Sequence, residues 1–190
     1  MQAEDMAKQT ALVETFYPEV VFGGFTNVDG TLAFYSRVNA LINAESVVLD
    51  VGCGRGAYAE DPVSFRRNMR ILRGKVARVI GMDPDPDAFA NPYVDEFKHL
   101  SGPRWPIADS SVDMVLADYV IEHVHEPDAF FAEAYRVTRP GGVLCVRTSN
   151  ALSYIGIAAR IIPNRLHARV LACAQENRHA RDVFATVYRC

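Results

Sequence analysis

Residues 49–56 read Leu-Asp-Val-Gly-Cys-Gly-Arg-Gly, and this stretch decides the fold. A short apolar run contains an acid, Asp50, and is followed by three glycines at alternate positions. Glycine permits backbone conformations that other residues avoid, and it lets a ligand approach the main chain closely. The start of a following helix offers free N–H groups. The stretch therefore predicts a strand, a ligand-binding turn and the start of a helix.

Three further β-branched, apolar runs resemble the run before the glycines. The predicted strands cover residues 46–51, 76–82, 112–117 and 142–148. Continuous apolar runs are typical of parallel strands that are buried on both faces. Segments with helical spacing of apolar residues alternate with these runs, at 32–42, 62–73 and 127–138. This order predicts an α/β fold with a doubly wound, mostly parallel sheet and helices on both faces, whose ligands bind beyond the carboxyl ends of the strands.

The chain divides into three predicted regions. Residues 1–45 are expected to form an N-terminal helical cap that includes a helix over 4–16. Residues 46–150 form the predicted α/β core, and residues 151–190 a helical segment that caps the substrate site. This last region holds six arginines against two acids. A solvated helix surface explains such a cluster, and contact with an anionic acceptor is the alternative.

Composition excludes several classes of partner. The chain of 190 residues has a net charge of −3 and a pI near 5.9, so it has no overall attraction to nucleic acid or to anionic lipid. No apolar stretch is long enough to span a bilayer. The four cysteines show neither a CxxC pair nor metal-ligand spacing with the histidines. We therefore expect a cytoplasmic protein with reduced thiols, without a metal site and without nucleic-acid or membrane partners.

The glycines alone leave two cofactors open. Gly52, Gly54 and Ala57 satisfy the loose GxGxxA pattern of dinucleotide-binding folds, and Asp83 closes the next predicted strand, where it would hold ribose hydroxyls. An NAD(P)-dependent oxidoreductase is therefore one alternative. Asp50 favours the other, because a carboxylate beside the loop suits a cation better than a pyrophosphate. S-adenosylmethionine (AdoMet) supplies such cations in its ammonium and sulfonium groups.

Three later motifs bear on this choice. They are Trp-Pro-Ile-Ala-Asp-Ser-Ser-Val-Asp at 105–113, Val-Ile-Glu-His-Val at 120–124 and Arg-Val-Thr-Arg-Pro-Gly-Gly at 136–142. In this order they resemble the core of the class I AdoMet-dependent methyltransferases, and most closely the small-molecule type 11 members. The resemblance covers residues 47–150. It implies an enzyme that uses AdoMet, releases S-adenosylhomocysteine (AdoHcy) and methylates a small-molecule acceptor.

The resemblance also implies roles for residues of the first two predicted strands. The acid and the backbone of the glycine loop would hold the methionine portion of AdoMet, which assigns this role to Asp50, Gly52, Cys53 and Gly54. Asp83 would bind the ribose hydroxyls.

The remaining cofactor contacts fall further along the chain. The resemblance places Pro84 against the adenine, and Ala117 with Asp118 on the methionine and methyl side of the pocket. The chain departs from the family at Ser101-Gly102, where members often carry Asp-Ala. The usual carboxylate acceptor for the adenine amino group is missing there, so we expect weaker cofactor binding, with a serine hydroxyl or a backbone carbonyl as substitute.

Methyl transfer from a sulfonium is an in-line displacement that needs no metal and no covalent nucleophile, so alignment and exclusion of water supply much of the rate. An acceptor hydroxyl or acidic carbon would also need a base, and His123 is the candidate. A capping role in the following loop is the alternative for this histidine. Tyr119, Arg147 and Asn150 stand near predicted strand ends, where they would shape the acceptor site or simply pack.

The end of the chain carries a last expectation. Family members normally continue with another helix and a pair of antiparallel strands, and we expect these final strands to be absent here, because the sequence is truncated or because the fold is shortened. A shortened fold would leave a sheet edge open to pairing with a second chain. A catalytically inactive AdoMet-binding or scaffolding subunit is the non-enzyme alternative.

Overall fold

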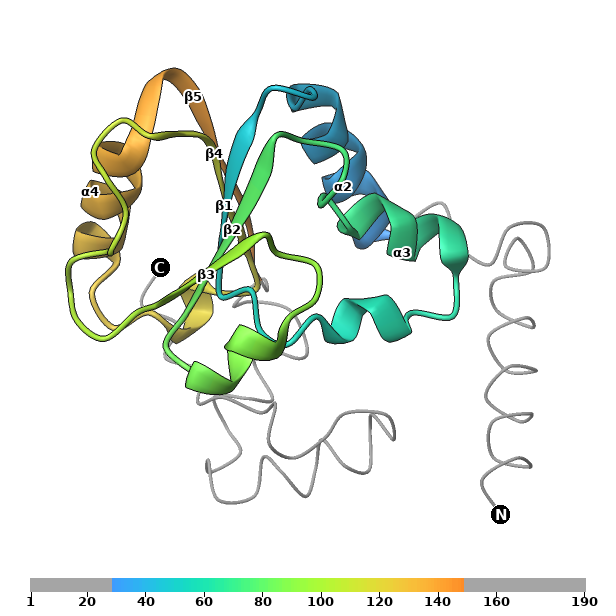
Figure 1. Ribbon diagram of the computed structural model, residues 1–190, viewed down its shortest axis with the longest axis horizontal. Helices are drawn as coiled ribbons and strands as arrows, with labels where there is room; N and C mark the ends of the chain where they lie inside the picture. Colours follow the sequence, from blue (N-terminus) through green and yellow to red (C-terminus); the bar gives the residue numbers. More distant parts are fainter. Residues whose placement is uncertain (1–28, 149–190) are drawn as a thin grey trace.

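Five parallel strands form the sheet in the computed structural model of the chain, which describes residues 29–148 (Figure 1). The strand order is β3-β2-β1-β4-β5. The strands are β1 (Val47–Val51), β2 (Arg78–Asp83), β3 (Glu96–His99), β4 (Val112–Asp118) and β5 (Thr138–Arg147). The predicted α/β fold with a doubly wound parallel sheet is therefore confirmed. The strand order reverses between β1 and β4, and in such sheets ligands bind outside the carboxyl ends at this switch point.

Helices cover both faces of the sheet. In Figure 1, α2 and α3 lie on one side of the strands and α4 lies on the other. Within the described residues, the α-helices are α2 (Gly30–Leu41), α3 (Ser64–Arg70) and α4 (Pro127–Val137), and the short 3₁₀ helices are η2 (Ala57–Glu60), η3 (Pro86–Ala90) and η4 (Ile121–His123). None of the helices within residues 29–148 has the length or the apolarity needed to cross a bilayer. The predicted helix over 4–16 and the predicted cap over 151–190 lie outside the described residues.

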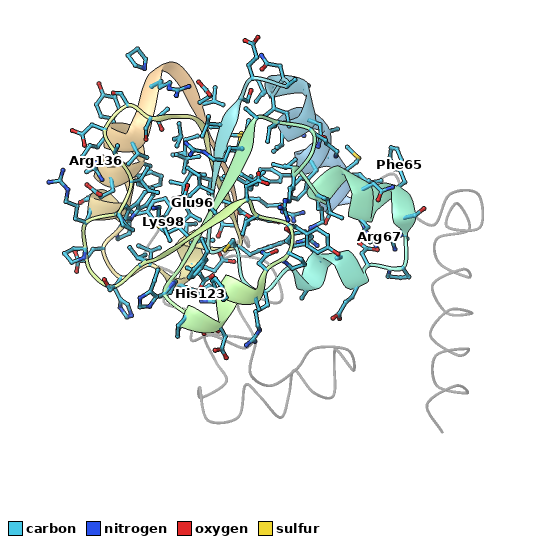
Figure 2. The ribbon with its side chains drawn as sticks, in the orientation of Figure 1. Phe65, Arg67, Glu96, Lys98, His123 and Arg136 are labelled. Carbon is cyan, nitrogen blue, oxygen red and sulfur yellow. The ribbon has the colours of Figure 1, made fainter. Side chains whose placement is uncertain are left out.

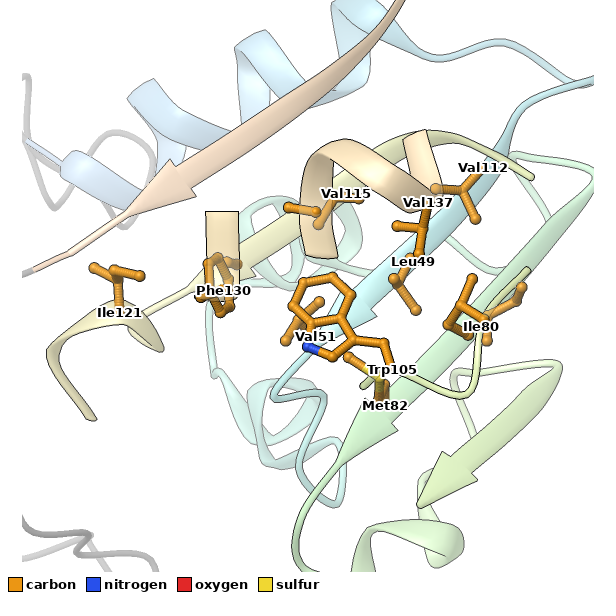
Figure 3. Packing of buried hydrophobic residues seen from close by; sticks show 13 residues of the cluster. Leu49, Val51, Ile80, Met82, Trp105, Val112, Val115, Ile121, Phe130 and Val137 are labelled. Atoms are coloured by element: carbon orange, nitrogen blue, oxygen red, sulfur yellow. The ribbon is translucent and has the colours of Figure 1, made fainter. Parts of the chain in front are cut away.

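Each face of the sheet carries its own hydrophobic core, because successive side chains of a strand point to opposite faces. The core beneath α4 includes Trp105, whose ring meets Phe130 edge to face with 5.2 Å between centroids (Figure 3). The core beneath α2 and α3 includes Tyr35, Val38, Val48, Val79, Met114 and Leu116. Burial of Tyr35 and Val38 fixes α2 on the sheet.

The motif at 105–113 has a structural role on the α4 face. Arg136 of α4 donates hydrogen bonds to the carbonyl oxygens of Ile107 and Trp105, at 2.9 and 3.1 Å, and also pairs with Asp109. Glu133 accepts from the backbone N–H of Trp105 at 2.7 Å. These bonds hold the crossover between β3 and β4 against α4, where Figure 2 labels Arg136.

Several predicted boundaries differ from the structure. The predicted strand at 142–148 begins earlier, at Thr138, so Pro140-Gly141-Gly142 lies inside β5 rather than before it. The pairing of β4 with β5 is irregular between Val112 and Met114, which accommodates this segment. The predicted helix at 62–73 is shortened to α3. β3 was not predicted, because its sequence Glu-Phe-Lys-His lacks an apolar run.

Candidate functional site

Three carboxylates lie on one face of the sheet at the carboxyl ends of its strands. In the register, Asp50 of β1 stands beside Gly81 of β2 and Leu116 of β4. Asp83 lies two residues after Gly81, and Asp118 lies two residues after Leu116. Because side chains alternate along a strand, all three acids lie on the same face of the sheet. This is the face that α2 and α3 cover. The sheet therefore gathers three negative charges at its switch point.

The glycine loop turns beside these acids. Gly52, Gly54 and Gly56 have φ angles of 69°, 51° and 81°, in the left-handed region that favours glycine. The N–H of Gly52 donates to the carbonyl oxygen of Met82 at 2.7 Å, and the N–H of Gly54 donates to the Asp83 carboxylate at 2.9 Å. The loop is thus fastened to the end of β2. The short η2 follows it instead of the α-helix start that the sequence predicts.

Asn91 holds the same loop, and sequence reasoning missed it. Its buried side-chain amide donates to the carbonyl oxygens of Cys53 and Gly54, at 2.9 and 3.2 Å. Its side-chain oxygen accepts from the N–H of Tyr93 at 2.9 Å. A Cβ on Gly56 would stand 2.8 Å from that oxygen. Asn91 therefore fixes the loop conformation, and a lone Asn after a 3₁₀ turn gives no sequence signal for this role.

The electrostatics of the site centre on Asp50, which is half-buried. Burial raises the pKa of its carboxyl group from 3.8 to about 7, and the negative charges of Asp118 and Asp83 add to this effect, while Arg70 opposes it. Burial and like charges, rather than hydrogen bonds, set this pKa. A cation that entered the site would relieve the repulsion, so the arrangement favours a positively charged ligand.

Asp118 is held by cationic and phenolic neighbours. Arg147 donates to both of its carboxylate oxygens, at 2.6 and 2.7 Å, and the hydroxyl of Tyr35 donates to one of them at 3.0 Å. Arg147 also donates to the hydroxyl of Thr31 at 2.8 Å. The sequence predicts that Arg147 shapes the acceptor site or simply packs. In the structure its guanidinium is bound to Asp118, so it holds that carboxylate in place.

The two predicted catalytic residues follow β4. Tyr119 is exposed and has a φ of 58°. The guanidinium carbon of Arg147 lies over the Tyr119 ring, 4.7 Å from the ring centroid. A left-handed backbone is uncommon for tyrosine, and such residues cluster at functional sites. His123, labelled in Figure 2, ends η4 and is half-buried, and its backbone N–H donates to the Val120 carbonyl oxygen at 2.9 Å. Both residues lie at the end of the sheet that holds the glycine loop.

The other predicted cofactor residues differ in burial, from the core to exposed loops. The side chain of Ala117 is fully buried in the core beneath α4, so only its main chain faces the strand ends. Burial raises the pKa of the Cys53 thiol, which keeps it neutral. Pro84, Ser101 and Gly102 are exposed in the loops that follow β2 and β3. Asn150 lies outside the described residues.

Comparison with known proteins connects this geometry to a family. The family described as "Methyltransferase domain" matches residues 49–146. A curated protein of Mycolicibacterium smegmatis, named "Probable S-adenosylmethionine-dependent methyltransferase", is 36% identical over 134 residues, which cover 67% of this chain and 47% of that protein. An "Uncharacterized methyltransferase" of Mycobacterium avium is 38% identical over 106 residues, 53% of this chain and 38% of that protein. The chain spans less than half the length of these two relatives.

A solved structure supports the fold alone. An AdoMet-dependent methyltransferase of Thermotoga maritima superposes with a TM-score of 0.51 at 21% identity, and the match covers 80% of this chain and 65% of that one.

Proposed function

Since this chain belongs to the methyltransferase domain family, whose cofactor is AdoMet, we propose that it transfers the methyl group of AdoMet to a small-molecule acceptor by in-line displacement. The observation that carries the proposal is the position of Asp50, a half-buried carboxylate beside a glycine loop and two further acids. This group of carboxylates fits a ligand with an ammonium and a sulfonium group. The AdoMet sulfonium supplies an already activated methyl group when it is bound.

The residues of the chain then act by binding and alignment. We propose that Asp50 and the backbone of Gly52, Cys53 and Gly54 hold the amino-acid portion. Asp83 takes the ribose hydroxyls with the acceptor capacity left on its two oxygens, each of which accepts one backbone N–H. We further propose Pro84 against the adenine and Ser101-Gly102 near its amino group. Asp118 and the main chain of Ala117 border the methyl side.

Ligand binding tests this function directly. We expect the full chain to bind AdoHcy and not NADH, because NADH would bring phosphates to a negatively charged site. Binding of the ammonium requires ionised Asp50, so the affinity for AdoHcy is expected to rise about tenfold from pH 6 to pH 8 and to level off above the pKa of Asp50, near 7. Isothermal titration calorimetry measures both effects. Binding of NADH in preference to AdoHcy would favour an oxidoreductase and defeat the proposal.

For an acceptor hydroxyl or acidic carbon, we propose His123 as the general base and Tyr119 as a wall of the acceptor site. His123→Asn is expected to slow AdoHcy release from AdoMet by about 100-fold or more, with a panel of phenolic and enolic acceptors, and to leave AdoHcy affinity within about twofold. His125→Asn, on the same loop, is the matched control. Unchanged turnover of the His123 variant would leave that residue a structural role only.

A further inference from the structure

Arg70, the last residue of α3, brings a positive charge into the group of acids. Its Nη2 lies 3.6 Å from the Asp118 carboxylate, and its guanidinium lies over the rings of Tyr58 and Tyr35, 5.0 and 5.7 Å from their centroids. The side chain is mostly buried, with 24% of its surface exposed. It is also the positive charge that opposes the raised pKa of Asp50. The two rings thus hold a cation beside Asp118 and close enough to Asp50 to lower its pKa.

One hydrogen-bond donor of Arg70 is left over in the part of the chain that the structure describes. Its Nε is buried and has no hydrogen-bond partner among the residues that the structure describes. The 3.6 Å contact with Asp118 is longer than a hydrogen bond, and both oxygens of Asp118 already accept from Arg147. A buried donor without a partner is costly, and a guanidinium has a planar set of donors that matches a carboxylate. Within residues 29–148, Arg70 has an ion pair with Asp118 but no acceptor for its Nε–H.

The balance of charge indicates which ligand group completes the site. When all are ionised, Asp50, Asp83 and Asp118 face Arg70 and Arg147, which leaves one net negative charge for a ligand with a net positive charge. A zwitterionic amino-acid tail offers an ammonium to the acids and a carboxylate acceptor to the Arg70 guanidinium, whose Nε lacks a hydrogen bond among the described residues. Arg147 is excluded from the second role, because it is bound to Asp118 and Thr31.

We propose that Arg70 binds the carboxylate of the cofactor's amino-acid tail and so selects adenosyl compounds that carry the complete tail. The inference rests on the proposed use of AdoMet. It gives α3 a role, since Asp50 of β1 and Arg70 of α3 present opposite charges to the two ends of one zwitterion. Adenosyl thioethers without the carboxylate would leave the Arg70 Nε–H without an acceptor and would bind more weakly.

The test compares three ligands on four forms of the full chain. The ligands are AdoHcy, its decarboxylated analogue S-adenosyl-3-thiopropylamine, and 5′-methylthioadenosine, which lacks the amino acid. The proteins are the wild type, Arg70→Gln, Arg70→Lys and Arg73→Gln. Arg73 is an exposed arginine that pairs with Asp95, so its variant repeats the loss of charge outside the site. Titration calorimetry gives each affinity, and thermal melting confirms that each variant is folded.

The wild type is expected to prefer AdoHcy over the decarboxylated analogue by at least about tenfold. Arg70→Gln should lower AdoHcy affinity about 10- to 100-fold, abolish this preference and leave 5′-methylthioadenosine unchanged, while Arg70→Lys restores part of the preference. Equal weakening of all three ligands, or an unchanged preference, overturns the role of Arg70. A wild type that binds none of them overturns the proposed function and this inference together.

Discussion

Asp50→Asn is expected to lower the affinity for AdoHcy about 100-fold at pH 8. The amide keeps the shape of the carboxylate but removes the charge that we propose for the ligand ammonium. Loss of one partner from a desolvated charge pair costs about 2–5 kcal/mol. In the Asp50→Asn variant, the positive charge of Arg70, which lowers the pKa of Asp50 in the native protein, is no longer offset by Asp50 and opposes the ligand ammonium.

The same substitution is expected to stabilise the unliganded protein. The pKa of Asp50 is raised from 3.8 to about 7 in the fold, so the native state holds a proton that the unfolded chain has lost between these values. Stability from this group therefore falls as the pH rises through 4–7 and is lowest above pH 7. Asp50→Asn removes this loss. The variant should unfold at higher urea than the wild type at pH 8, and the gain should vanish near pH 4.

Opposite effects on binding and on stability distinguish a ligand-binding acid from a structural one. Asp128→Asn, an exposed acid in the first turn of α4, serves as the control and should change neither quantity appreciably. Urea unfolding and calorimetric titration at the two pH values complete the comparison. If Asp50→Asn lost stability at pH 8 and kept its AdoHcy affinity, the proposed role of Asp50 would be wrong.

The fold could be predicted because its signals are local. The apolar runs that became β1, β2 and β4 are buried on both sides, and the Pro127 start of α4 fits its helix. The position of Asp50 and the glycines within one short stretch also predicted where the candidate site lies in the fold. These features need no knowledge of which segments meet in space.

The missed features depend on long-range contacts. Asn91 reaches the loop carbonyls from 37 or 38 residues away in the sequence, and Arg70 meets Asp118 across the sheet switch point. Neither residue type carries a motif, so only the folded chain brings them together. The four-residue β3 is polar in sequence and is defined by its pairing with β2.

Gly56→Ala is expected to lower the free energy of unfolding by about 3 kcal/mol. Its φ of 81° costs an alanine about 1–2 kcal/mol. The new Cβ would also stand 2.8 Å from the Asn91 side-chain oxygen and 2.9 Å from the Tyr93 ring, and such overpacking costs about 1–3 kcal/mol. Asn91 cannot yield easily, because its amide is bound to the carbonyls of Cys53 and Gly54.

Gly54→Ala separates the two causes, since Gly54 has a φ of 51° but no atom within 4 Å of an added Cβ. Its stability loss should reflect the backbone alone, about 1–2 kcal/mol, as measured by urea unfolding. The additional stability loss of Gly56→Ala over Gly54→Ala then measures the cost of the contacts with Asn91 and Tyr93. In a double-mutant cycle, Asn91→Ala should recover at least about 0.5 kcal/mol of that excess, because it removes one of the two contacts. Additive losses would show instead that the Asn91 side chain moves aside without cost, and the loop would owe its shape to its glycines and to β2.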